Sequence, residues 1–156
     1  MKVVIIMGSK ADLEFAKKIA DYLNEFGLEY EMRVASAHKT PEKVLEIIKE
    51  YDRAIFITVA GRSNALSGFV DANTLNPVIA CPPYSDKFAG ADIFSSLRMP
   101  SGVAPMVVIE PENAALAAAK IIALYDEKVR KKVEEYQMKK KKEVQKADEE
   151  VRELRI

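Results

Sequence analysis

Short apolar runs alternate along this chain with stretches in which apolar residues recur every three or four positions. Residues 2–7 form a β-branched run that stops at Gly8 and Ser9, a pattern typical of a strand buried on both faces. Apolar residues at helical spacing follow, and Gly27 suits the left-handed position at the end of a helix. These positions are Leu13, Ala16, Ile19, Ala20, Leu23 and Phe26. The pattern predicts a strand, a tight turn and a helix.

The same alternation continues through the first 110 residues. Further strands are expected over residues 28–34, 54–59, 77–80 and 103–109. A second helix is expected from Pro41, which suits a first helical turn, with Thr40 as its N-cap. Its predicted buried face is Val44, Leu45, Ile47, Ile48 and Tyr51. Alternating strands and helices predict an α/β fold, a three-layer αβα sandwich with a parallel, flavodoxin-like sheet joined by right-handed crossovers.

The chain beyond Pro111 is expected to be helical. Residues 113–125 are rich in alanine, and residues 126–156 are highly charged with a thin apolar stripe. The stripe consists of Val129, Val133, Tyr136, Val144, Ala147, Val151 and Leu154. A helix of this kind cannot fold against itself and needs a groove for its apolar side. We therefore expect one α/β catalytic domain over 1–125 and a long C-terminal helical extension over 126–156 that packs on a neighbouring subunit.

Composition narrows the class of protein. The chain has 156 residues, of which 49% are apolar and 31% charged, as in one globular domain. Basic and acidic residues both number 24, so no overall positive field would hold nucleic acid. The apolar runs are too short for a membrane span or a signal peptide, and the single cysteine, Cys81, can form no intramolecular disulfide. We expect a cytoplasmic protein with no nucleic-acid or membrane partner.

Small, polar and glycine residues gather after the predicted strands, where parallel α/β sheets bind ligands. They occupy residues 8–12, 36–40, 61–64 and 82–85. Gly8 and Ser9 would begin a helix with unpaired N–H groups and a hydroxyl, which suits a phosphate. The alternative is a plain turn capped by Ser9 or Asp12. The pattern matches neither a dinucleotide fingerprint nor a P-loop.

His38 is the only histidine of the chain. It lies in a polar loop at the expected ligand face, and an imidazole titrates near neutral pH, which suits proton transfer. The sequence shows no cluster of ligands spaced to hold a metal. Cys81 precedes two prolines without a basic neighbour, so we interpret it as a small buried residue rather than a nucleophile. Arg62 and Arg98 could each bind an anion or form an ion pair at an interface.

Four segments at strand ends resemble the 5-aminoimidazole ribonucleotide (AIR) carboxylase, or PurE, family of purine biosynthesis. They are Met7-Gly8-Ser9-Lys10-Ala11-Asp12, Ser36-Ala37-His38-Lys39-Thr40-Pro41, Ala60-Gly61-Arg62-Ser63-Asn64-Ala65-Leu66-Ser67-Gly68 and Ser95-Ser96-Leu97-Arg98-Met99-Pro100-Ser101-Gly102. Class I members are mutases that move a carboxylate within carboxyaminoimidazole ribonucleotide, whereas class II members use CO2. Lys39 in place of an arginine, and residues 61–64 in place of a second glycine-rich loop with a histidine, resemble class II.

The resemblance implies reversible carboxylation of AIR with CO2 to 4-carboxy-5-aminoimidazole ribonucleotide, with no cofactor or metal. It implies that His38 is the general acid and base. It also implies that Ser9, Asp12, Ser36 and Lys39 hold the ribose phosphate end, and that Gly61 and Ser63 line the base and CO2 region. Ala11 stands where the family usually has a serine, so one hydroxyl that would contact the phosphate is absent, although the backbone amides can still serve. Family members are homo-octamers, and we expect an octamer here.

Two alternatives stay open from the sequence. The first is a class I mutase, which would turn over the carboxyamine substrate but not AIR with bicarbonate. The second is a flavodoxin-like module that binds a mononucleotide without transforming it. Such a module would have no turnover for a His38 substitution to remove, whereas the enzyme would keep its affinity for nucleotide and lose its rate.

Overall fold

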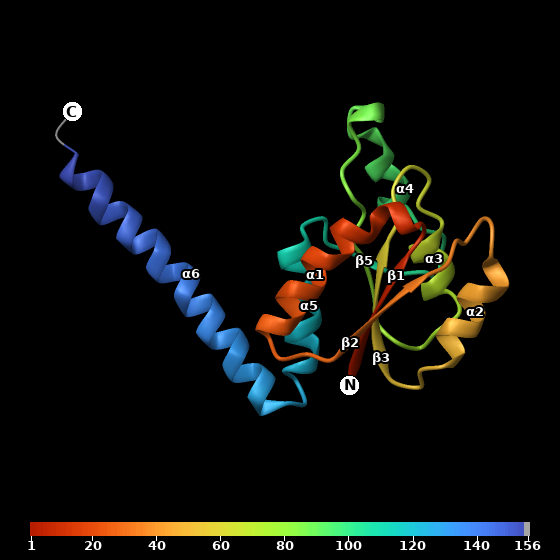
Figure 1. Ribbon diagram of the computed structural model, residues 1–156, viewed down its shortest axis with the longest axis horizontal. Coiled ribbons are helices and arrows are strands. Elements are labelled where there is room, and N and C mark those ends of the chain that lie inside the picture. Colours follow the sequence, from red (N-terminus) through yellow and green to blue (C-terminus); the bar gives the residue numbers. More distant parts are fainter. Residues whose placement is uncertain (155–156) are drawn as a thin grey trace.

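The computed structural model of the protein describes residues 1–154 as a parallel sheet between two layers of helices, with one long helix at the C-terminal end (Figure 1). The strands are β1 (Lys2–Met7), β2 (Tyr30–Val34), β3 (Ala54–Val59), β4 (Val78–Ala80) and β5 (Met106–Val107). Their order is β2-β1-β3-β4-β5, and all neighbours pair in parallel. The predicted α/β fold with a flavodoxin-like sheet is confirmed.

Side chains that alternate along the strands build one core on each face of the sheet. Val3 and Ile5 pack with one helical layer, whereas Val4 and Ile6 pack with the other. The first layer holds α1 (Leu13–Glu25) and α5 (Pro111–Ile122), and the second holds α2 (Pro41–Lys49) and α3 (Leu66–Asp71) (Figure 1). The sheet is therefore covered on both sides, which leaves its edges and strand ends open to ligands.

Several elements differ from the predicted ones. Strand β2 begins at residue 30 rather than 28, because the Leu28 N–H still donates to the Leu23 carbonyl at the end of α1. Strand β5 covers 106–107 rather than 103–109, since its neighbour β4 offers only three residues for pairing. Helix α3 has no counterpart in the predicted pattern, because six residues are too few to show a helical period.

The structure confirms the predicted end of α1 but not the predicted cap of α2. Gly27 follows α1 with a φ of +69°, the left-handed conformation expected at that position. Pro41 begins α2, as predicted, but Thr40 does not cap the helix with its side chain. Its Oγ1 instead accepts the N–H of Ser36 at 3.0 Å. The prediction of Thr40 as a side-chain cap is therefore wrong, because the preceding loop takes up the hydroxyl.

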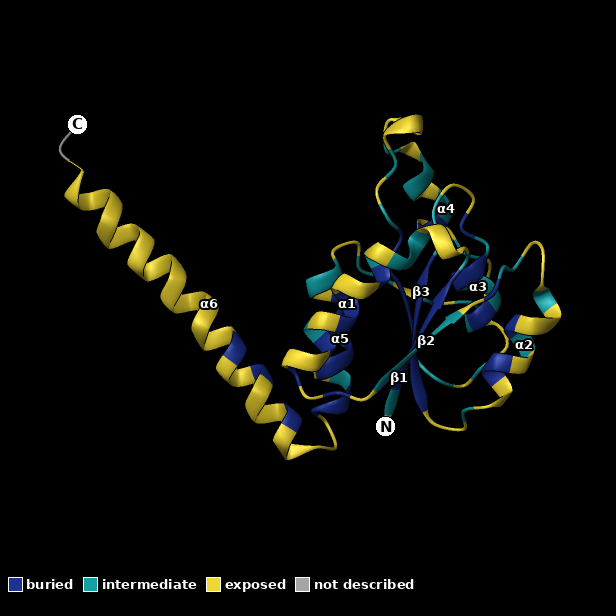
Figure 2. Ribbon diagram, in the orientation of Figure 1, coloured by how far each residue is buried: buried dark blue, intermediate teal, exposed yellow. Residues whose placement is uncertain are grey.

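The C-terminal helix α6 (Glu127–Glu153) has two different halves. Val129, Val133 and Tyr136 are buried in the core of this same chain, against α1 and α5. These three residues find their apolar partners within the chain, because α6 turns back onto α5 after Asp126. Packing of the extension on a neighbouring subunit stays a prediction. Further along, α6 extends away from the rest of the chain and is exposed (Figure 2). Arg155 and Ile156, at the end of the predicted extension, lie outside the described residues.

Over residues 1–154, no helix combines the length and the apolar character that a membrane crossing requires.

Candidate active site

The segments that follow β1, β2, β3 and β4 enclose a cleft of about 390 Å³. It lies over the ends of β1 and β3, where the chain leaves the sheet in opposite directions and where such folds bind ligands. The lining residues are Gly8, Ser9, Ala11, Asp12, Ser36, Ala37, His38, Lys39, Ala60, Gly61, Arg62, Ser63, Leu66, Pro83, Tyr84 and Ser85. The structure thus brings all seven of the predicted site residues to one cleft; their roles stay predictions.

The turn after β1 forms one wall of the cleft. The N–H of Gly8 donates to the Val59 carbonyl at 2.9 Å, so the prediction of an unpaired donor is wrong for Gly8. The pairing of β1 with β3 runs one residue beyond the strand and takes up this group. Ser9 Oγ accepts the N–H of Ala11 at 3.1 Å. Because a hydroxyl can accept one hydrogen bond and donate another, Ser9 can still donate to an anion.

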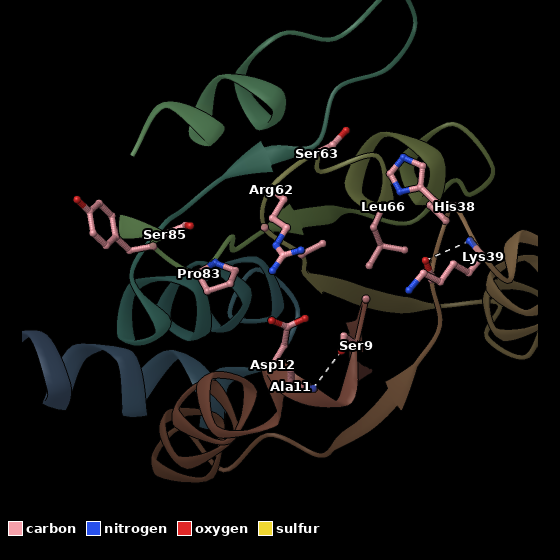
Figure 3. Close-up of a pocket in the computed structure, with 16 residues that line it drawn as sticks. Ser9, Ala11, Asp12, His38, Lys39, Arg62, Ser63, Leu66, Pro83 and Ser85 are labelled. Atoms are coloured by element: carbon pink, nitrogen blue, oxygen red, sulfur yellow. Dashed lines mark hydrogen bonds between the residues drawn. The ribbon is translucent and has the colours of Figure 1, made fainter. Parts of the chain in front are cut away.

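Asp12 is half-buried on the same wall and faces the cleft (Figure 3). Burial raises the pKa of Asp12 above its ordinary value of 3.8, although a backbone hydrogen bond with Ser9 and the charge of Arg62 lower it in part. Shifted titratable groups in clefts are typical of functional sites. A carboxylate here could accept hydrogen bonds from the hydroxyl groups of a sugar.

Residues 36–40 form a closed turn that carries His38 to the opposite wall. The N–H of Thr40 donates to the Ser36 carbonyl at 2.8 Å, and the N–H of Lys39 donates to Ser36 Oγ at 3.2 Å. His38 and Lys39 are exposed at the tip of this turn. An imidazole and an ammonium group therefore stand side by side in sequence on a loop that its own hydrogen bonds hold together.

The segment after β3 forms the third wall. A Cβ added to Gly61 would meet Pro83 Cγ at 3.6 Å, so the two segments are in close contact. Arg62 has a φ of +61°, in the left-handed region that costs a non-glycine residue about 1–2 kcal/mol. Its side chain extends between the two walls toward Asp12 (Figure 3). Of the two arginines left open by the sequence, Arg62 lines the cleft and Arg98 does not.

Residues behind the cleft, to which the sequence pattern assigned no role, brace this third wall. They belong to residues 92–96, at the start of α4 (Phe94–Leu97). The N–H of Asn64 donates to Ser95 Oγ at 2.9 Å, and Asn64 Nδ2 donates to Ser96 Oγ at 2.9 Å. Contacts across about thirty residues leave no periodic signal in a sequence. The Ser95–Gly102 motif that contributed to the resemblance therefore begins with supports for the cleft.

Two further observations concern groups that could react. Cys81 is buried, and burial raises the pKa of its thiol to about 12, so it is an inert core residue, as interpreted from the sequence. Within the part of the chain that the structure describes, no group of three His, Cys, Asp or Glu side chains is placed to hold a metal ion.

Sequence comparisons connect this chain to known proteins. The family model described as AIR carboxylase matches residues 2–143. Phosphoribosylaminoimidazole carboxylase of Archaeoglobus fulgidus is 71% identical over 154 residues, which are 97% of this chain and 86% of that protein. The protein of the same name from Treponema denticola is 56% identical, over 86% of this chain and 87% of its own. N5-carboxyaminoimidazole ribonucleotide mutase of Methanocaldococcus jannaschii is 47% identical, over 97% and 98%.

Structural comparison gives the same result. The crystal structure of Treponema denticola PurE matches with a TM-score of 0.93 at 51% sequence identity, covering 95% of this chain and 96% of the other. The family model spans most of the chain, and the relatives match over nearly their whole length. This chain therefore belongs to the AIR carboxylase family.

Proposed function

We propose that the chain carboxylates AIR with CO2, reversibly, to 4-carboxy-5-aminoimidazole ribonucleotide. The observation that carries the proposal is the cleft in which His38 stands opposite Ser9 and Asp12, with the Arg62 side chain extending between the walls. The class II assignment is supported by Lys39 and by the sequence of residues 61–64. It is also supported by relatives named carboxylase at 71% and 56% identity, against one named mutase at 47%.

In this reaction the protein has to position the two reactants and to transfer one proton. The imidazole ring of AIR is an electron-rich enamine, so its ring carbon can attack CO2 directly. A carbon–carbon bond forms, one C=O electron pair moves onto oxygen as the carboxylate, and the ring loses its aromaticity. His38 then takes the ring proton, which restores the aromatic ring, and returns it in the reverse direction. Holding CO2 and the ring at reacting distance lowers the free-energy barrier of such a step by about 7 kcal/mol or more.

The remaining residues account for binding. Ser9, Ser36 and Lys39 supply hydroxyl groups and a positive charge for the phosphate, and Asp12 supplies an acceptor for the ribose. Gly61 and Ser63 lie at the base and CO2 region. Because Ala11 has no hydroxyl, the phosphate would depend more on Ser9 and Lys39.

A substrate comparison tests the proposal. Purified protein is assayed with AIR and bicarbonate, and separately with the carboxyamine ribonucleotide without added CO2, by following the absorbance of the product. Turnover of AIR supports direct carboxylation. Turnover of the carboxyamine alone would assign the chain to class I, and binding of nucleotide without turnover of either would leave only a binding module.

Asp12→Asn is expected to raise the melting temperature at pH 7 and to lower kcat/KM. Burial raises the folded pKa of Asp12, so its contribution to stability is largest below the unfolded pKa and is lost as pH rises through the folded pKa. An asparagine cannot ionise and avoids this loss. Because a hydrogen bond to a charged group is worth about 1.5–3 kcal/mol, kcat/KM should fall about 10- to 100-fold.

Thermal melts between pH 4 and pH 8, together with steady-state kinetics, check this prediction. Asp21→Asn is the matched control, because Asp21 is exposed on α1, the helix that follows Asp12, and should change neither quantity. A gain in melting temperature that is equal at all pH values would count against titration of Asp12 as the cause.

Assembly as a homo-octamer, in the cytoplasm, belongs to the same proposal. The far half of α6 leaves Val144 and Val151 71% and 62% exposed, and Leu154, directly after the helix, is 63% exposed. The spacing of Val144 and Val151 places them on one side of the helix. Apolar residues so arranged favour burial against a second copy of the chain.

Val144→Asp is expected to shift the protein to smaller assemblies, because association would bury an unpaired charge. Light scattering after size-exclusion chromatography measures the mass, and circular dichroism checks that the subunit keeps its helices. Gln145→Asp adds the same charge one residue further along the helix and should leave the mass unchanged. A Val144→Asp protein of wild-type mass would show that this side of α6 is not an interface.

A further inference from the structure

Two side chains outside the cleft hold the backbone of Arg62. The carboxylate of Asp92 accepts the N–H of Arg62 through Oδ2 at 2.9 Å. The hydroxyl oxygen of Ser95 lies 3.1 Å from the Arg62 carbonyl and 2.7 Å from the Asp92 carbonyl, and can donate its proton to either. The same oxygen accepts the N–H of Asn64 at 2.9 Å. We call Asp92 and Ser95 the clamp.

The clamp acts where the backbone most needs support. Arg62 has a φ of +61°, a conformation that a residue with a Cβ keeps only when its surroundings impose it. The hydrogen bonds of the clamp reach the N–H and carbonyl of Arg62 and the N–H of the residue two positions on. Asp92 thereby holds the N–H of the strained residue, and the Ser95 hydroxyl lies within hydrogen-bond distance of its carbonyl.

The backbone conformation of Arg62 sets the direction of its side chain. The guanidinium lies in the cleft on the side of Asp12 (Figure 3), close enough for its positive charge to act on that carboxyl. In the proposed reaction, a neutral CO2 becomes a carboxylate in this same cleft. A cation that faces the cleft stabilises such developing charge.

We propose that Asp92 and Ser95 are positioning residues for the carboxylation, which they assist by holding Arg62 in its left-handed turn with the guanidinium facing the cleft. The inference rests on the proposed function. Asp92 acts through the peptide N–H, for which an amide oxygen is also an acceptor, although a weaker one than a carboxylate.

Kinetics of four variants test the clamp. Asp92→Ala should lower kcat about 10- to 100-fold, the cost of a misplaced group, with a smaller change in KM. Asp92→Asn should retain most of the rate, because its Oδ1 can still accept the Arg62 N–H. Ser95→Ala should show a smaller loss of kcat than Asp92→Ala. Asp86→Ala, which removes an exposed acid from the preceding 3-10 turn, residues 86–88, is the control and should match the wild type.

A double-variant cycle shows whether the clamp acts through Arg62. Once Arg62→Ala has removed the guanidinium, adding Asp92→Ala should cost little more, whereas independent effects would add. Full additivity would overturn the inference, and so would wild-type kcat in both Asp92→Ala and Ser95→Ala. If Asp92→Ala fails to fold, the cycle is run with Ser95→Ala.

A titration of Asp12 tests the clamp without measuring turnover, and so independently of the proposed function. Asp12 is followed by NMR with labelled aspartate in wild type, Asp92→Ala and Asp92→Asn. Removing the negative charge of Asp92 would by itself lower the pKa of Asp12, whereas release of Arg62 would raise it. We expect a rise in Asp92→Ala alone, and no rise would overturn the clamp even if AIR is not a substrate. Wild-type protein without AIR turnover would overturn only the function.

Discussion

His38→Asn is expected to lower kcat for AIR carboxylation about 10²- to 10⁴-fold, the usual contribution of general acid–base catalysis, and to leave nucleotide affinity nearly unchanged. Asparagine retains hydrogen-bonding capacity but cannot accept the ring proton near pH 7. The phosphate and ribose contacts proposed for Ser9, Asp12 and Lys39 do not involve the imidazole, so binding should persist. Kinetics with AIR and bicarbonate, combined with calorimetric titration of AIR, measure the two quantities separately.

Lys39→Met is the contrasting variant, because it removes a charge from the same loop without touching the proton-transfer group. It should weaken AIR binding and raise KM, with a smaller effect on kcat. An active His38→Asn protein with wild-type kcat would exclude His38 as the acid and base. Loss of AIR binding in the same protein would instead indicate that His38 binds the nucleotide.

Tyr136→Ala is expected to destabilise the protein by about 3 kcal/mol, as large-to-small changes of buried aromatic residues do. Tyr136 is 7% exposed, and the centroid of its ring lies 5.0 Å from that of the Phe26 ring in an edge-on arrangement. Its hydroxyl also contacts Glu112, at the start of α5. The substitution would leave a cavity between α1, α5 and α6, and would detach the beginning of the long helix from the core.

Chemical denaturation followed by circular dichroism measures the loss. Tyr136→Phe is the matched control, since it keeps the ring and removes only the hydroxyl, and it should cost about 1 kcal/mol. Equal losses in the two variants would mean that the contact with Glu112, rather than the ring, holds α6. Wild-type stability in both would mean that the near half of α6 contributes nothing to the fold.

The sheet and the cleft follow from local patterns, which is why the sequence could predict them. Strand β3 is buried along its whole length and shows as a continuous apolar run, and His38 and Ser9 lie in segments adjacent to strand ends. Helix α3 is too short to show a period. The Gly8 N–H could not be recognised as paired, because its partner Val59 is fixed by the register between two strands.

The supports of the cleft were beyond the reach of sequence patterns for a different reason. Asp92 and Ser95 contact the backbone of residues 62–64. A hydrogen bond to the backbone does not require a particular residue type at the partner position, so the sequence gives no sign of it. Such contacts become visible only when the fold brings together segments about thirty residues apart. The Ser95–Gly102 motif was noticed as a resemblance, but its physical role needed the structure.

The attachment of α6 has a consequence for how copies of the chain could meet. Lys139 reaches Glu25 at 3.9 Å and Lys140 reaches Glu112 at 3.1 Å, just beyond the buried Tyr136. These two ion pairs hold α6 to α1 and α5 near Tyr136. Contacts within one subunit therefore set the direction in which the exposed far half of α6 extends. A second copy of the chain that bound the far half of α6 would contact a helix that is already ordered. Association would therefore cost less conformational entropy than the binding of a flexible segment.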